Sequence, residues 1–278
     1  MKEYYTFNAD ELAKLSSKQI EVVESDVDLY YHMALSMYEE IETNNNAGRI
    51  TTCILPVGPV FQYRRFIMLL KRKPLDLSGL HIFSMDEYLD ESGGPISPDS
   101  PLSFRGFIKH ELINAMPKEM GLNENQIYFP DPGSAGEYDN RIEELGGIGF
   151  CHAGVGIVGH LAFNEPIPET EITAEEFAGL PTRVVSLTRE TITINSNTAL
   201  RGAFEEIPRQ AVTVGMKQIL SAQKLRIYFN RPWQGAVCRK ALLMDPTPEF
   251  PVTLARNHPD VMYIMTELVA APPEFALK

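Results

Sequence analysis

Short apolar, β-branched runs alternate with amphipathic segments along most of this chain, and this alternation constrains the fold more than any other feature. Residues 51–56 form such a run, and a helical pattern follows at 61–71. The same order returns at 80–84, before a helix near 102–113, and at 148–152. Further runs expected to form strands lie at 211–214, 225–229, 252–254 and 261–264. We therefore predict an α/β fold with a mainly parallel, doubly wound, Rossmann-like sheet that helices cover on both faces.

A helix is also predicted before the first of these runs. Apolar residues between Asp26 and Glu42 follow the spacing of one helix face, with Asp26 as the expected N-cap and the run 44–48 as the expected end. The chain shows no internal repeat, and no stretch is rich enough in Gly, Ser or Pro to separate two domains. Residues 1–278 are therefore expected to form a single domain.

Charge and composition exclude several classes of partner. The 25 basic and 37 acidic residues give a net charge of -12, which repels both a nucleic acid and an anionic bilayer. No apolar run approaches the roughly 20 residues of a membrane span, and the first residues are too acidic for a signal peptide. The three cysteines, Cys53, Cys151 and Cys238, are far apart and form no pair motif, which indicates a reducing compartment. We expect a cytoplasmic chain with no nucleic-acid or membrane partner.

In a parallel sheet the ligand crevice lies beyond the carboxyl ends of the strands, so residues just after each predicted strand are the first candidates for function. Three such segments stand out by their composition. They are 55–60, 84–88 and 154–166.

The third segment contains a glycine pattern that is typical of dinucleotide sites. Gly154, Gly156 and Gly159 match GxGxxG after a predicted strand. The context argues against a nicotinamide site, because Pro166 interrupts any long helix and the acids some 20 residues on lie in the polar stretch 169–176 rather than at a strand end. A tight turn that needs positive φ at glycine accounts for part of the loop.

Titratable side chains follow these glycines and also follow the strand at 80–84. His160 and Glu165, with Asn164 beside them, offer a group that titrates near neutrality and a carboxylate able to orient it. A histidine after a strand is often only structural. Asp86 and Glu87 place two carboxylates after another strand, where one could act as a base, although a solvated acid or a helix cap is the more ordinary role of such a pair.

Taken together, the segment from Ser84 to Tyr88 and the segment from Gly154 to Pro166 closely resemble the glucosamine-6-phosphate deaminase (isomerase) family. The 6-phosphogluconolactonases are related and share the glycine-rich loop and histidine, but they lack the Phe-Asn-Glu-Pro ending found at 163–166. The similarity covers most of the chain. It continues from the loop at 55–56 through 182–188, 195–196 and 211–215 to 258–259.

The resemblance implies a reaction in which a 2-amino aldose phosphate becomes fructose 6-phosphate and ammonia, without a metal or other cofactor. It implies that Asp86 is the base at C2, that His160 assists ring opening and that Glu165 holds the imidazole in the useful tautomer. The ligand would be a small sugar or sugar phosphate, and homo-oligomers are possible. The residues implied to contact the substrate are Gly58, Glu87, Gly156, Gly159 and Asn164.

The chain departs from the family pattern where a phosphate would be held. The loop at 57–61 lacks the family's hydroxyls, and Pro59 has no N–H to donate. Asn197 and Gln234 stand where the family has an arginine and a lysine, and Val158 replaces an aspartate two residues before the histidine. Four arginines are candidate replacements for the missing cations. They are Arg64, Arg105, Arg201 and Arg231.

These departures leave three hypotheses open. The first is an enzyme of the deaminase and isomerase family whose true substrate can differ from the usual one. The second is a non-catalytic member that binds a sugar and regulates another process. The third is a lactonase-like hydrolase, since ester hydrolysis can use the loop histidine without Asp86.

Overall fold

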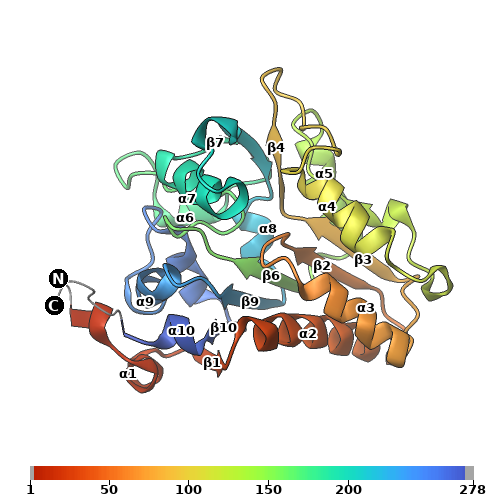
Figure 1. Cartoon of the computed structure of the whole chain (residues 1–278), viewed down its shortest axis with the longest axis horizontal. Coiled ribbons are helices and arrows are strands. Elements are labelled where there is room, and N and C mark those ends of the chain that lie inside the picture. Colours follow the sequence, from red (N-terminus) through yellow and green to blue (C-terminus); the bar gives the residue numbers. More distant parts are fainter. Residues whose placement is uncertain (1–2, 273–278) are drawn as a thin grey trace.

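Seven strands form one sheet in the order β1-β10-β9-β6-β2-β3-β5, and every neighbouring pair runs parallel (Figure 1). This computed structural model describes residues 3–272. The strands are β1 (Gln19–Val23), β2 (Thr51–Leu55), β3 (Leu80–Ser84), β5 (Ile127–Tyr128), β6 (Phe150–Gly154), β9 (Lys224–Phe229) and β10 (Val261–Thr266).

A smaller antiparallel sheet has the order β4-β8-β7. Its strands are β4 (Asp86–Leu89), β7 (Arg183–Ser186) and β8 (Gln210–Thr213). Only Met85 separates β3 from β4, so the chain leaves the carboxyl end of β3 and enters the second sheet at once. The second sheet therefore begins at the edge where a parallel sheet places its ligand crevice.

Ten α-helices and several shorter helical turns connect the strands in the described part of the chain. The α-helices are α1 (Ala9–Leu15), α2 (Asp26–Asn46), α3 (Gln62–Arg72), α4 (Phe104–Ile108), α5 (Ala135–Glu144), α6 (Ala174–Ala178), α7 (Arg189–Leu200), α8 (Met216–Leu220), α9 (Gln234–Leu243) and α10 (Glu267–Ala270). The shorter turns are η1 (Glu3–Thr6), the π-helical η2 (Lys109–Ile113), η3 (Lys118–Met120), η4 (Glu124–Gln126), η5 (Phe204–Glu206) and η6 (Pro251–Asn257).

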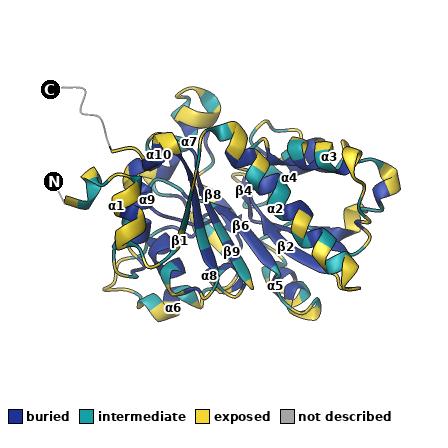
Figure 2. Ribbon diagram, turned by 90° about the horizontal axis from the view of Figure 1, so that it is seen from below, coloured by how far each residue is buried: buried dark blue, intermediate teal, exposed yellow. Residues whose placement is uncertain are grey.

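Strand β2 shows how side-chain alternation produces a core on each face of the sheet. Cys53 and Leu55 belong to a cluster that includes Met37 of α2 and Phe66 of α3. Ile54, between them, belongs to a second cluster with residues of α5 and α9. All five residues of β2 are buried, as expected of a strand with helices on both sides (Figure 2). The predicted doubly wound parallel sheet is confirmed.

Two local predictions were wrong. Residues 252–254 lie in η6, where the Thr253 amide donates to the Phe250 carbonyl, because a short apolar run fits a buried turn as well as a strand. Helix α2 is capped by the Ser25 side chain rather than by Asp26, although it ends at Asn46, within the predicted run 44–48. The strand predicted at 211–214 is present as β8 and belongs to the antiparallel sheet.

The structure tests two of the expectations from composition, and only in part. All three cysteines are buried and free. Within residues 3–272, no helix combines the length and apolar character needed to cross a membrane. The assignment of residues 1–278 to a single domain stays a prediction.

The fully buried Arg239 guanidinium joins the two ends of the described chain to α9. It donates mainly to backbone carbonyls, with one contact of 3.8 Å to the Cys238 sulfur, and no carboxylate pairs with it among residues 3–272. A buried cation without a counter-charge depends on such hydrogen bonds for its solvation. Its acceptors are the carbonyls of Phe7, Gly235, Val269, Ala270 and Ala271.

We expect Arg239→Lys to lower the free energy of unfolding by about 2–4 kcal/mol, because an ammonium cannot reach carbonyls that a planar five-donor group satisfies. Urea denaturation measures this change. The control is Arg72→Lys at an exposed position of α3, with an expected effect below about 0.5 kcal/mol. Equal stability of the two variants would show that the buried contacts contribute little.

Candidate active site

The smaller sheet brings two of the predicted site segments together at the carboxyl edge of the large sheet. Asp86 opens β4 just after β3, and the loop that carries His160 follows β6. Thr213 of β8 is the ladder partner of Asp86, and its hydroxyl accepts a hydrogen bond of 2.9 Å from the Phe163 amide in that loop. One residue of β8 thus links both segments.

The Asp86 carboxyl is buried without a counter-charge. The residue is 8% exposed, and its carboxyl makes no hydrogen bond or ion pair with any residue between 3 and 272. Burial, and then the negative charge of Glu87, raise the pKa of Asp86 to about 8. A carboxylate that holds its proton this tightly is a stronger base than an ordinary aspartate and is suited to proton abstraction near neutral pH.

Glu87 points elsewhere and fixes the start of α4. Its carboxylate accepts hydrogen bonds from the Ser103 hydroxyl and the Arg105 amide, each at 2.8 Å, and from the Phe104 amide at 3.1 Å. The residue is fully buried. Both carboxylate oxygens are therefore engaged by the protein, so the structure gives Glu87 a structural role, and its predicted contact with substrate remains a prediction.

His160 and Glu165 form the pair that the sequence suggested. His160 Nδ1 lies 3.3 Å from Glu165 Oε1, and Thr188 donates its hydroxyl to the other carboxylate oxygen at 3.0 Å. Burial alone would raise the pKa of Glu165, but the contact with His160 and the hydroxyls of Thr191 and Thr188 lower it below its usual value. An ionised Glu165 favours the imidazole tautomer with its proton on Nδ1, which leaves Nε2 as an acceptor.

The loop glycines make room for this pair. A Cβ on Gly156 would lie 1.9 Å from His160 Nε2, so only glycine allows the imidazole to lie against the backbone there. Gly159 has a φ of +83°, and a Cβ on it would meet the Phe250 ring at 2.6 Å. Gly58 is exposed, and its carbonyl packs close to Gly154 at the end of β6. Whether these backbones contact substrate remains a prediction.

Asn164 is fully buried and fully engaged by the protein. Its amide donates to the carbonyls of Leu161 and Val214, at 3.0 and 2.9 Å, and its oxygen accepts from Arg183 at 2.8 Å. These bonds fix the loop after His160 against the end of β8. The expected contact of Asn164 with substrate also stays a prediction.

The two residues that the sequence comparison placed at the family's cation positions, Asn197 and Gln234, occupy very different surroundings. Asn197 is exposed on α7. Gln234 is buried: its amide donates to the Val155 carbonyl at 2.7 Å, and its oxygen accepts from the amides of Asn230 and Arg231. Gln234 therefore braces the loops after β6 and β9 through both ends of its side-chain amide.

Among the candidate replacement cations, Arg231 is the most available. Arg64 is paired with Glu111, and the Arg105 guanidinium lies 5.0 Å from the centre of the Phe129 ring. Arg201 is exposed at the end of α7. Arg231 follows β9 at the carboxyl edge, and no carboxylate in the described part of the chain forms an ion pair with it.

Tyr88 was not recognised as part of this site from the sequence. Its ring centre lies 5.3 Å from that of Phe163, and its hydroxyl accepts from Asn195 at 2.9 Å. Burial raises the pKa of Tyr88, and the negative charges of Asp86 and Glu165 add to this effect, so both carboxylates act on one hydroxyl. The only signal in the sequence for Tyr88 was its partner Asn195, which belongs to the family pattern. Nothing local in the sequence indicates which strand pairs with β4.

Acidic residues are not arranged as a metal centre here. Residues 3–272 contain no group of three or more histidine, cysteine, aspartate or glutamate side chains placed to hold a metal ion.

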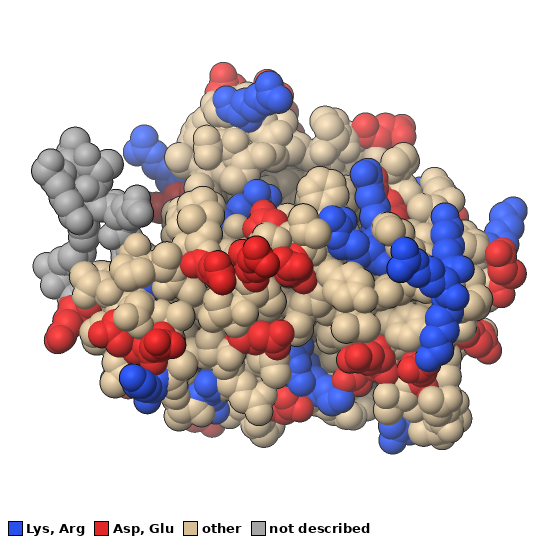
Figure 3. Space-filling view, turned by 60° about the horizontal axis from the view of Figure 1, so that its bottom comes forward, with Lys and Arg blue, Asp and Glu red and all other residues tan. Residues whose placement is uncertain are grey.

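On the face in Figure 3 acidic and basic side chains are interspersed, and basic ones gather toward the side where α3 lies. The net charge of the chain is thus spread unevenly.

Comparison with known proteins agrees with the geometry. No family model matches the chain. A glucosamine-6-phosphate deaminase of Thermoanaerobacter pseudethanolicus is 28% identical over 277 residues, which cover 98% of this chain and 94% of the relative. The chain is homologous to the glucosamine-6-phosphate deaminases. A deaminase of Clostridium perfringens is also 28% identical, over 96% of this chain and 97% of its own length.

Solved structures show the same fold. A monomeric glucosamine-6-phosphate deaminase superposes with a TM-score of 0.77 at 20% identity, covering 91% of this chain and 98% of that one. A 6-phosphogluconolactonase from Trypanosoma cruzi gives 0.66 at 17% identity, over 91% of this chain and 96% of that one. The resemblance to the deaminases, and to the lactonases as their structural relatives, is confirmed.

The raised pKa of Asp86 predicts a pH-dependent stability. Between its usual value of 3.8 and about 8, the unfolded chain releases the Asp86 proton while the folded chain keeps it, so stability falls as pH rises. Asp86→Asn removes this loss. The difference in free energy of unfolding between the variant and the wild type should therefore shift in favour of the variant, by up to about 4 kcal/mol between about pH 5 and about pH 8.

Urea denaturation at both pH values tests this expectation, with Asp99→Asn at an exposed position as the matched control. The control should show no pH-dependent gain. A constant difference between Asp86→Asn and the wild type would mean that the folded protein does not raise the pKa of Asp86.

Proposed function

We propose that the chain is an enzyme that isomerises a 2-amino aldose, or a closely related sugar derivative, to a ketose with loss of ammonia. The observation that carries this proposal is the buried Asp86 carboxyl, with its pKa raised to about 8, joined through Thr213 to the loop that bears His160 and Glu165. The deaminase names of the relatives support the same reaction class.

The three residues divide the chemistry among them. His160, with its proton held on Nδ1 by Glu165, takes the proton of the anomeric hydroxyl at Nε2 and passes it to the ring oxygen, which opens the sugar ring. Asp86 takes the proton from C2 and returns it at C1, while a proton passes from the amino nitrogen to O1, so that the amino aldehyde becomes a ketose imine. Water then adds to the imine carbon and ammonia leaves, so the products are the ketose and ammonia.

The substrate itself is proposed to differ from that of the relatives in how its anionic group is held. A phosphate dianion in a crevice needs cations or several N–H donors. Gln234 is already engaged by backbone groups, Asn197 is exposed and uncharged, and Pro59 has no N–H. An unphosphorylated or differently substituted amino sugar therefore suits these residues at least as well as glucosamine 6-phosphate.

Two other functions remain alternatives. Lactone hydrolysis is favoured by the structural relation to 6-phosphogluconolactonases, and it would use the His160 loop without needing Asp86 as a base. A sugar-binding regulator would bind the same ligands without turnover. Incubation with glucosamine, glucosamine 6-phosphate and a phosphogluconolactone separates the three, since only the proposed reaction releases ammonia.

Asp86→Asn should reduce ammonia release by about 10²-fold or more, because the amide keeps the shape of the carboxyl but cannot accept the C2 proton. In the wild type, kcat/KM should rise with pH toward an apparent pKa of about 8, since the ionised carboxylate is the active form. Asp99→Asn should retain full activity. Undiminished turnover by a folded Asp86→Asn variant would exclude Asp86 as the base.

Calorimetric titration with glucosamine and glucosamine 6-phosphate tests the altered anion site. We expect the phosphate to improve affinity by less than about tenfold, because Asn197 and Gln234 carry no charge with which to bind it. A much larger gain that is lost in Arg231→Met would show that Arg231 rebuilds the anchor. The chain would then be an ordinary deaminase with a relocated cation.

A further inference from the structure

A hollow in the molecule lies at the edge of the sheet opposite the candidate active site. It has a volume of about 620 Å³ and is lined by residues at the amino-terminal ends of β1, β9 and β10. Asp86 and His160 follow the carboxyl ends of their strands, and these strands are parallel to β1, β9 and β10. The two sites therefore lie at opposite edges of one sheet.

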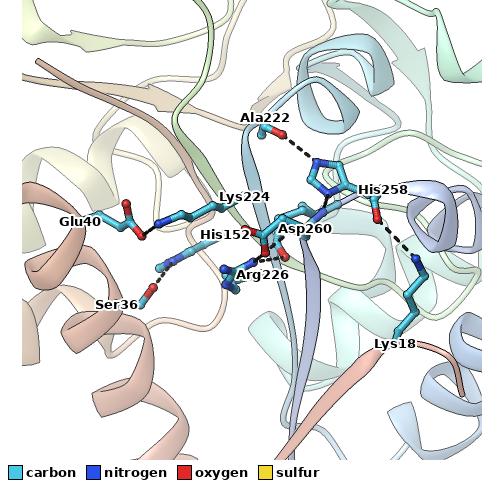
Figure 4. A network of polar contacts seen from close by, with 10 residues as sticks. Lys18, Ser36, Glu40, His152, Ala222, Lys224, Arg226, His258 and Asp260 are labelled. Atoms are coloured by element: carbon cyan, nitrogen blue, oxygen red, sulfur yellow. Dashed lines mark hydrogen bonds and ion pairs between the residues drawn. The ribbon is translucent and has the colours of Figure 1, made fainter. Parts of the chain in front are cut away.

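Three cations face this hollow, and one of them has no counter-charge. Lys224 is paired with Glu40, and Arg226 Nη1 lies 2.8 Å from Asp260 Oδ1. Lys18 donates only to the carbonyl of His258, at 3.4 Å, and pairs with no carboxylate in the described part of the chain (Figure 4). Glu40 and Asp260 offset only two of the three cations, so the hollow keeps a net positive charge in a chain whose total charge is -12.

Arg226 also has N–H groups that make no hydrogen bond to the described residues. All its hydrogen bonds come from Nη1, which reaches the Leu225 carbonyl and the Asp260 carbonyl and carboxylate. Nε and Nη2 make no hydrogen bond within residues 3–272. A guanidinium with two adjacent free N–H groups can bind two oxygens of one phosphate.

The surroundings hold these cations in place. His258 Nδ1 accepts from the Asp260 amide at 3.1 Å, so its Nε2 carries the proton that it shares with the Ala222 carbonyl at 2.7 Å. This fixes the loop that carries both Asp260 and the carbonyl bound by Lys18. His152 lies beside Arg226 in the ladder, and burial lowers its pKa to about 3, so it stays neutral. The positive charge of the hollow thus comes from the two lysines and the arginine.

We propose that this hollow is a second binding site, which takes the phosphate group of a small phosphorylated metabolite. Lys18 and the free N–H groups of Arg226 would hold the phosphate oxygens, with Lys224 nearby. The volume is in the range of small-molecule sites and far exceeds a bare phosphate ion, so it leaves room for the organic part of the ligand. The proposal does not depend on the reaction at the opposite edge.

Line broadening of the ³¹P NMR signals of inorganic phosphate and of glucose 6-phosphate tests this proposal, at constant ionic strength set with chloride. Both signals should broaden with the wild-type protein and with Arg231→Met, which alters only the candidate active-site edge. Lys18→Met should weaken binding of both probes about tenfold or more. Lys109→Met removes an exposed lysine of η2 and should change nothing.

Three results would overturn the proposal. They are no broadening with the wild type, equal affinity of Lys18→Met and wild type, and loss of binding in Arg231→Met with retention in Lys18→Met. The last result would place the phosphate in the crevice near Asp86 instead. Tighter binding of glucose 6-phosphate than of inorganic phosphate, lost with Lys18→Met, would support a site that also contacts the organic part of the ligand.

Discussion

A carboxyl group buried without a partner cation is the constraint on which the rest of the candidate site depends. Asp86 is removed from water at the edge of the large sheet, and a protein normally avoids this by pairing or neutralising the charge. Here burial raises the pKa of the Asp86 carboxyl, so that the group keeps its proton and avoids a buried charge. The antiparallel pairing of β4 with β8 creates that burial, and the same β8 holds the loop of His160 through Thr213. The small sheet thus both buries the Asp86 carboxyl and positions the loop that carries His160.

The loops around this carboxyl are fixed by side chains that the protein satisfies internally. Glu87 engages the first amides of α4, Asn164 ties its loop to β8, and Gln234 braces the loops after β6 and β9. Each makes a set of hydrogen bonds that would be costly to break. These hydrogen bonds hold the loops around Asp86 in a defined geometry.

Periodicity was enough to predict the large sheet, because β2 is buried at every residue and β3 and β9 are mostly buried, with apolar residues at most positions. It failed for β1, whose residues are half exposed at the sheet edge, and for the two-residue β5. The small sheet could not be predicted, because its antiparallel pairs join residues far apart in the sequence. For the same reason Asp86, His160 and Glu165 were identified from their motifs, whereas Thr213 and Tyr88 became visible only in the structure.

Direct titration of the Asp86 carboxyl tests the central claim. In protein labelled with ¹³C at the aspartate carboxyls, one resonance should titrate near pH 8 and be missing from the spectrum of Asp86→Asn. The other aspartates serve as internal references for ordinary behaviour. If every aspartate resonance titrates below about pH 5, Asp86 is an ordinary acid and cannot be the tuned base proposed here.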